Sequence, residues 1–182
     1  MYRLIDFVAA LFGLIFAFPL FLVVLIIGYF DTGSPLFFQE RVGKNKKPFI
    51  LVKFRTMSVD TKSVASHLAS SASITKLGAF LRKTKLDELP QLWNVFIGDM
   101  SLVGPRPNLY NQEELIEARD SKNVYSVRPG ITGLAQIQNI DMSTPDKLAR
   151  TDAIMIKKMS LKNYFSFILT TVTGAGSGDA VK

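Results

Sequence analysis

Cysteine is absent from the 182-residue chain, and histidine occurs once, at His67. Without thiols the chain can form neither a disulfide framework nor a thiolate metal site. A histidine-based catalytic triad would have to use His67, which lies in the Ser- and Ala-rich stretch SVASHLASSAS with no partner pattern near it, and we interpret it as a surface residue. The chemistry of this chain therefore has to come from carboxylates, basic side chains and backbone amides.

Nucleotide-binding signatures are absent as well: there is no Walker loop, GxGxxG motif or kinase motif. The net charge of +7 favours polyanionic partners, which include nucleic acids, anionic membranes and phosphorylated substrates. With 48% hydrophobic residues, however, the chain is too apolar for a typical nucleic-acid-binding module. We therefore expect a membrane surface as a partner, and no nucleic acid.

The N-terminal run from Phe7 to Phe30 contains no charged residue. It exceeds the roughly 20 apolar residues that a spanning helix needs. It is too long for a cleaved signal peptide, and no small-x-small cleavage site follows it. Pro19 lies near its middle, where proline removes a backbone hydrogen bond and kinks a helix.

Two topologies are compatible with this run: a single spanning helix, or a re-entrant hairpin that breaks at Pro19 and returns to the same face. Basic residues follow the run in the stretch 41–47, which places its C-terminal side in the cytoplasm by the positive-inside rule, and Arg3 precedes it. Asp6 at the edge of the run is costly in lipid unless it is paired. Arg3 lies three residues earlier on the same helical face and is the expected partner of Asp6.

The remaining chain predicts alternating short elements. Leu36–Val42 and Phe49–Met57 have the pattern of a β-hairpin with GKNKK as its turn. Helical spacing or composition is found at 74–85, 89–96, 109–119, 146–159 and 160–173, and the first of these has a basic face suited to a membrane interface. RPGITGLAQIQ predicts a loop that enters an extended segment.

Asp87 and Glu88 are adjacent in LDELPQLWNVFIGDMSLVGPRP, the stretch from Leu86 to Pro107. One interpretation is that these two acids do no more than cap the start of a helix, and this interpretation stays open. Alternatively, two carboxylates that point about 100° apart suit different tasks around one centre, one attacking phosphorus and one holding a cation. The basic residues near turns and strand ends favour phosphate chemistry: Lys53, Arg55, Arg106 and Arg128.

Three motifs, in this order behind an apolar N-terminus, carry a resemblance to a known family: KFRTM (53–57), LDELPQLWNVFIGDMSLVGPRP (86–107) and RPGITGLAQ (128–136). With them the chain resembles the bacterial sugar transferase domain, in the small monotopic phosphoglycosyl transferase form. The similarity extends from Arg3 to about Leu169.

The resemblance implies transfer of a sugar 1-phosphate from a UDP-sugar to polyprenyl (undecaprenyl) phosphate, as the first membrane step of bacterial glycoconjugate synthesis. Asp87 would attack the β-phosphate, which releases UMP and leaves a covalent phosphoglycosyl-aspartate. Glu88 would hold Mg²⁺. The turn formed by Pro105, Arg106 and Pro107 is implied to lie near the nucleotide and the phosphates.

The resemblance also implies a mainly helical α+β fold of a monotopic membrane protein. It places a re-entrant helix-break-helix hairpin at residues 1–30 and a catalytic domain with a short β-hairpin and amphipathic interfacial helices at 31–173. The composition of the tail at 174–182, GAGSGDAVK, predicts a flexible segment. RLID (3–6) matches the family's Arg-x-x-Asp pattern, so re-entry becomes the expected topology. Phe18 stands where the family usually has serine before the proline.

The partners expected from the resemblance are a UDP-sugar, polyprenyl phosphate and the phospholipids of the bacterial inner membrane at its cytoplasmic face. A homo-oligomer is left open. The alternative function is a non-catalytic, membrane-anchored scaffold of a glycan assembly pathway, against which the intact acid pair argues.

Overall fold

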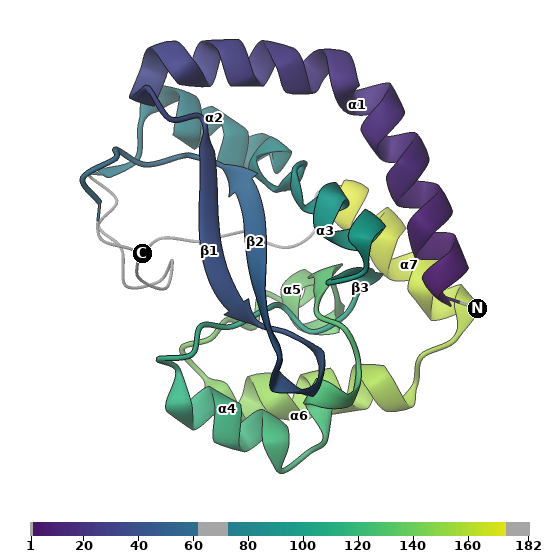
Figure 1. Ribbon diagram of the computed structural model, residues 1–182. Helices are drawn as coiled ribbons and strands as arrows, with labels where there is room; N and C mark the ends of the chain where they lie inside the picture. The colour runs from purple at the N-terminus through teal and green to yellow at the C-terminus, as the bar shows by residue number, and fades with distance from the viewer. Residues whose placement is uncertain (1, 62–72, 174–182) are drawn as a thin grey trace. The chain divides into compact units, whose positions relative to one another are not determined.

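The computed structural model describes residues 2–61 and 73–173 (Figure 1). His67, most of the predicted 60–73 loop and the tail at 174–182 lie outside the described residues. The described residues form two compact units, one from residues 2–39, 50–61 and 73–98 and one from residues 40–49 and 99–173. The predicted division into 1–30, 31–173 and 174–182 stays a prediction.

The first unit contains the long N-terminal helix and the elements that carry the acid pair. Strands β1 and β2 form a two-stranded hairpin, and the end of the hairpin that holds the turn belongs to the second unit. Figure 1 shows the two arrows running in opposite directions. The elements in chain order are α1 (Tyr2–Thr32), β1 (Leu36–Val42), the turn η1 (Lys44–Lys46), β2 (Pro48–Phe54), α2 (Lys76–Thr84), the 3₁₀ turn η4 (Leu86–Glu88) and α3 (Gln91–Ile97).

Helix α1 is continuous over 31 residues and contains Pro19. It is long and apolar enough to cross a membrane, by length and composition alone. Figure 1 shows a sharp bend along its course, as expected where a proline removes a backbone hydrogen bond and its ring clashes with the preceding turn. The structure thus has one bent helix where the sequence predicted two helical arms separated by a break.

The N-terminal end of α1 packs against α3. The Arg3 guanidinium donates hydrogen bonds to the backbone carbonyls of Val95 and Phe96, the second at 2.7 Å, and so satisfies acceptors at the C-terminal end of α3. The rings of Phe7 and Phe96 stack with centroids 5.0 Å apart. Asp6 is buried, and its predicted pairing with Arg3 stays a prediction.

The C-terminal half of α1 joins an apolar cluster with β2 and α2. Val24, Phe54 and Leu81 form its fully buried centre. Around them pack partly buried side chains from α1, β1, α2, η4 and the residue after it: Phe21, Leu25, Leu36, Leu77, Leu86 and Leu89. Burial of this apolar surface is the main favourable term that fixes α1 to the rest of the unit.

The second unit is mainly helical, with one two-stranded parallel sheet. Strands β3 (Ser101–Val103) and β4 (Gly130–Thr132) pair with Ser101 opposite Gly130 and Val103 opposite Thr132. The other elements are α4 (Glu113–Asp120), η5 (Val124–Ser126), α5 (Leu134–Ile137), α6 (Pro145–Lys157) and α7 (Leu161–Val172). Leu115, Ala135 and Leu148 form a buried cluster that joins α4, α5 and α6.

The predicted fold class, mainly helical α+β with a short β-hairpin, is confirmed. Two boundaries differ by three residues or more. Strand β2 ends at Phe54 rather than Met57, and Met57 forms an isolated antiparallel bridge with Ile74 instead. Helix α4 begins at Glu113 rather than Leu109, because Leu109–Gln112 forms a turn in which the Gln112 side chain accepts from the Leu109 amide at 2.9 Å.

Asn94 joins α3 to strand β2. Its side-chain oxygen accepts a hydrogen bond from the Val52 amide at 3.1 Å, and its side-chain nitrogen donates to the Ile50 carbonyl at 2.7 Å. The fully buried amide group thus pairs with β2 as another strand would. The position of α3, and of the acid pair just before it, depends on this contact.

Substitution of Asn94 by alanine leaves the Val52 amide and the Ile50 carbonyl without their partner. We expect Asn94→Ala to lower the free energy of unfolding by about 2 to 4 kcal/mol, measured by thermal or denaturant unfolding in detergent. Asn163→Ala is the matched control, because Asn163 makes one exposed hydrogen bond, to the Lys158 carbonyl. Equal and small losses in both variants would contradict the anchoring role of Asn94.

Candidate active site

The acid pair lies on the 3₁₀ turn η4 between α2 and α3. Lys85 precedes it in the left-handed conformation, with φ of 58°, and closes α2. The exposed fractions of Asp87 and Glu88 are only 3% and 9%. A capping role would not require this burial, which costs free energy for each carboxylate unless it is compensated.

The apolar cluster beneath the acid pair fixes the turn on both sides. Leu86, directly before the pair, and Leu89, directly after it, both pack against the buried centre that includes Val24 of α1. The turn that carries the carboxylates is therefore packed in the same apolar cluster as α1. The sequence pattern L-D-E-L indicates this packing, since its two leucines are three residues apart and flank the acids.

Lys53 and Arg55, two of the predicted substrate-binding residues, also lie in the first unit. Lys53 on β2 is buried, with its ammonium 5.6 Å from the centroid of the Phe37 ring. Arg55 donates to the Ser34 carbonyl at 2.8 Å and to the Leu36 carbonyl at 3.3 Å. Arg55 therefore holds the base of the hairpin, and its substrate role stays a prediction.

The remaining predicted residues lie in the second unit, where the β3–β4 pair brings two loops together. The Ser101 amide donates to the Pro129 carbonyl at 2.8 Å, and the Gly130 amide donates to the Pro105 carbonyl at 2.9 Å. A Cβ atom on Gly130 would lie 2.0 Å from the Gly104 nitrogen, so only glycine permits this approach. GPRP (104–107) and RPG (128–130) are thus neighbours, although they are separate in the sequence.

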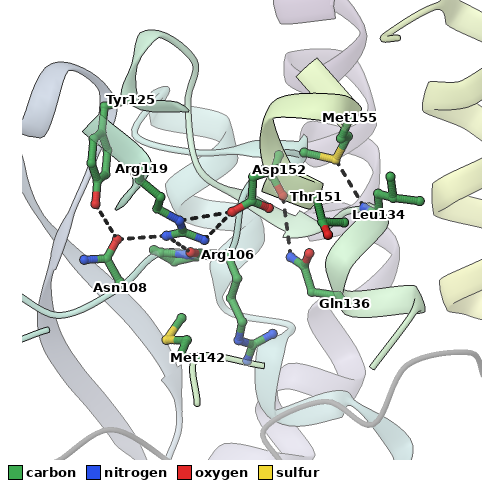
Figure 2. A network of polar contacts seen from close by, with 12 residues as sticks. Arg106, Asn108, Arg119, Tyr125, Leu134, Gln136, Met142, Thr151, Asp152 and Met155 are labelled. Atoms are coloured by element: carbon green, nitrogen blue, oxygen red, sulfur yellow. Dashed lines mark hydrogen bonds and ion pairs between the residues drawn. The ribbon is translucent and has the colours of Figure 1, made fainter. Parts of the chain in front are cut away.

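A buried ion pair in the second unit was missed by the sequence reasoning. Arg119 on α4 and Asp152 on α6 have exposed fractions of 1% and 0%, and the shortest distance between their charged atoms is 2.7 Å (Figure 2). Burial raises the pKa of the Asp152 carboxyl, and the charge of Arg119 opposes that rise. EARD at 117–120 has the composition of an exposed helix end, so nothing local marked Arg119.

Magnesium suits the chemistry of the acid pair. Within the described ranges 2–61 and 73–173, no group of three or more His, Cys, Asp or Glu side chains forms a complete metal cage. Mg²⁺ is usually bound through one or two carboxylates plus the phosphates of a substrate. The adjacent, buried carboxylates of Asp87 and Glu88 supply the oxygen donors that such a site uses.

Comparison with known proteins gives one family. The model of a family described as bacterial sugar transferase matches residues 1–177. An uncharacterized sugar transferase, EpsL of Bacillus subtilis, is 39% identical over 159 residues, which cover 87% of this chain and 78% of that protein. The UDP-glucose:undecaprenyl-phosphate glucose-1-phosphate transferase of Caulobacter vibrioides is 39% identical over 180 residues, which cover 93% of this chain and 67% of the relative.

Some relatives are much longer than this chain. The UDP-galactose-lipid carrier transferase of Erwinia amylovora is 34% identical over 187 residues, which cover 93% of this chain and 39% of the relative. The chain thus spans about two fifths of that relative's length.

Proposed function

The chain belongs to the bacterial sugar transferase family, and on this premise we propose that it transfers a sugar 1-phosphate from a UDP-sugar to undecaprenyl phosphate and releases UMP. The relative from Caulobacter vibrioides is named for this reaction with UDP-glucose. A relative from Salmonella typhimurium, 34% identical over 187 residues, is named an undecaprenyl-phosphate galactose phosphotransferase. The reaction would begin glycoconjugate synthesis in the membrane.

The observation that carries the proposal is the position of the acid pair. Asp87 and Glu88 are nearly buried, adjacent, and set on a turn whose flanking leucines pack against α1. The phosphate of a membrane-embedded lipid lies at the level of the head groups. An enzyme that acts on this phosphate has to hold its catalytic carboxylates at the same level. The apolar cluster shared by α1 and the turn η4 would hold the carboxylates at that level.

The proposed mechanism has two displacements at one phosphorus atom. An Asp87 carboxylate oxygen forms a bond to the β-phosphorus of the UDP-sugar, and the bond from that phosphorus to the bridging oxygen breaks, so that UMP leaves. A phosphate oxygen of undecaprenyl phosphate then forms a bond to the same phosphorus. The bond to Asp87 breaks, which regenerates the carboxylate and yields the undecaprenyl diphosphate sugar.

Glu88 is assigned to hold Mg²⁺. When bound, the cation neutralises charge on the diphosphate of the donor. Adjacent residues of a helical turn project in different directions, so Glu88 could hold a ligand without competing for the phosphorus. The basic residues of the second unit, Arg106 and Arg128, are assigned to substrate phosphates on the resemblance.

We place α1 as a re-entrant helix in the cytoplasmic face of the inner membrane. Its N-terminal end is bound to α3 through Arg3, and its C-terminal half is bound to the cluster around Phe54 and Leu81. A straight helix of 31 residues would separate its ends by about 46 Å. Attachment of both parts to short elements of one compact unit, together with the bend, supports return to the same side.

Apolar side chains cover much of the outside of α1, as a lipid-embedded helix requires. Those with the largest exposure are Leu4, Phe12, Ile15, Phe16, Phe18, Val23, Ile26, Tyr29 and Phe30. Helix α7 has an exposed apolar stripe at Leu161, Phe165, Leu169 and Val172, and on α2 Phe80 is exposed. These two helices are assigned to the membrane interface.

Asp87→Asn tests the nucleophile. The amide cannot form the acyl phosphate bond, so we expect UMP release to fall at least about a thousandfold in an assay with UDP-sugars, Mg²⁺ and undecaprenyl phosphate. Asp60→Asn, the same change at an exposed position of the first unit, is the control and should be active.

The nucleotide product separates the proposed function from others. Near-normal UMP release by Asp87→Asn would rule out the covalent mechanism. Release of UDP by the unaltered protein would indicate transfer of the sugar without its phosphate, and absence of any nucleotide product across a panel of UDP-sugars would favour the scaffold alternative.

Glu88→Gln tests the metal role. A neutral amide oxygen is a weaker ligand for a hard cation than a carboxylate, so we expect the Mg²⁺ concentration for half-maximal UMP release to rise at least about tenfold. The control is Glu117→Gln, at an exposed position on α4. An unchanged Mg²⁺ requirement in Glu88→Gln would remove Glu88 as the ligand.

Single cysteines test the topology, since the chain has no cysteine of its own. Tyr2→Cys and Lys47→Cys should react with an impermeant thiol reagent from the same side of oriented vesicles. Phe16→Cys, on the exposed apolar surface of α1, should react only after detergent is added. Reaction of Tyr2→Cys and Lys47→Cys from opposite sides would establish a spanning helix.

A further inference from the structure

The backbone of the turn at 105–108 is held at every residue. The Pro105 carbonyl accepts from the Gly130 amide at 2.9 Å, and the Arg106 carbonyl accepts from Nη1 of Arg119 at 2.9 Å. The Pro107 carbonyl accepts from Nη1 of Arg41 at 3.0 Å, and the Asn108 carbonyl accepts from the Val42 amide at 2.9 Å. The two prolines restrict φ as well. Such a turn presents the Arg106 side chain from a fixed backbone.

Arg119 is the donor that links this turn to the core of the second unit. Its Nε and Nη2 atoms both donate to Oδ2 of Asp152, at 3.0 and 2.7 Å, while Nη1 also donates to Oδ1 of Asn108 at 2.8 Å (Figure 2). Only the planar fork of a guanidinium can serve these acceptors together. A lysine ammonium would keep the charge but lose this geometry.

Asn108 receives a second donor from η5. The Tyr125 hydroxyl donates to Oδ1 of Asn108 at 3.0 Å, and Nδ2 of Asn108 donates to the Leu109 carbonyl at 3.0 Å. Burial raises the pKa of the Tyr125 phenol, which keeps it protonated and able to donate at neutral pH. The buried network thus fixes the residue two positions after Arg106 through its side chain.

Buried ion pairs give little net stability, because desolvation offsets their attraction. The Arg119–Asp152 pair is therefore better explained by the geometry that it imposes than by stability. Figure 2 shows the side chain of Arg106 extending away from the ion pair, on the far side of the turn.

We infer that Arg119 and Asp152 are positioning residues for donor binding, which act by holding the Arg106 backbone so that its side chain meets a phosphate of the UDP-sugar. Neither residue touches the substrate in this account. The inference rests on the proposed function, since it takes the donor phosphates as the ligand of Arg106.

Arg119→Lys tests the inference directly. We expect faster hydrogen–deuterium exchange of the Arg106 and Asn108 amides, weaker binding of UMP, and a KM for the UDP-sugar raised at least about tenfold, because displacement of a binding group by about 1 Å is enough for such a loss. Leu148→Ala is the matched control: it destabilises α6, the same helix that carries Asp152, in a cluster that does not include the turn.

Tyr125→Phe is a milder second variant, in case Arg119→Lys does not fold. It keeps both charges and removes one hydrogen bond to Asn108, so a rise in KM of about two- to tenfold is expected. The inference would be overturned if the amide exchange rates of Arg106 and Asn108 were unchanged in both variants. It would also be overturned if the KM of each variant for the UDP-sugar were no higher than that of Leu148→Ala, compared at the same loss of thermal stability.

The exchange measurement needs no activity, so failure of the inference and failure of the proposed function can be told apart. If the unaltered protein releases no UMP, the proposed function fails, and with it the assignment of a phosphate to Arg106. If the protein is active and faster exchange leaves the KM unchanged, the positioning role alone is wrong.

Discussion

The packing of α1 against the turn of the acid pair is the interaction on which the rest of the first unit depends. Val24 of α1 is buried with Phe54 and Leu81, and the leucines on either side of the carboxylates pack onto the same centre. Hydrophobic burial is non-directional, but close packing of side chains from α1, β1, β2, α2 and η4 in one cluster restricts how these elements can be arranged. The carboxylates therefore occupy a fixed position relative to the long apolar helix.

Polar contacts, in addition to the apolar cluster, fix the position of α3. Arg3 binds the carbonyls at the end of α3, and Asn94 of α3 pairs with the edge of β2. Helix α3 is only seven residues long and would not be stable alone, so these contacts and its packing on α1 set its position. The turn of the acid pair is thus held by contacts with α2 before it, α3 after it and α1.

Much of the fold could be predicted because its signals are local. The uncharged run, the hairpin around GKNKK and the helices near 76–84, 145–157 and 161–172 follow from hydropathy and spacing. Strands β3 and β4 could not be predicted, since three residues carry no periodicity and their pairing joins segments 29 positions apart. The bend of α1 follows from Pro19, whereas the continuity of the helix across it does not.

In the candidate site, too, the residues with local motifs could be predicted from the sequence, and those that act through tertiary contacts could not. The acid pair and the basic residues were found from their motifs, but the hydrogen bonds of Arg55 to the Ser34 and Leu36 carbonyls at the base of the hairpin were not. Arg119 and Asp152 are 33 positions apart, and each looks like an ordinary charged residue of an amphipathic helix. Only the tertiary structure reveals that both are buried and that Arg119 reaches the turn of Arg106.

The central claim is that an oxygen of Asp87 becomes bonded to the phosphorus that carries the sugar. Its most direct test is peptide mass spectrometry of the protein after brief incubation with a UDP-sugar and Mg²⁺ in the absence of undecaprenyl phosphate. The account predicts a sugar-phosphate mass on Asp87 that disappears when undecaprenyl phosphate is added. An unmodified Asp87 in a preparation that still forms the lipid-linked product would contradict it.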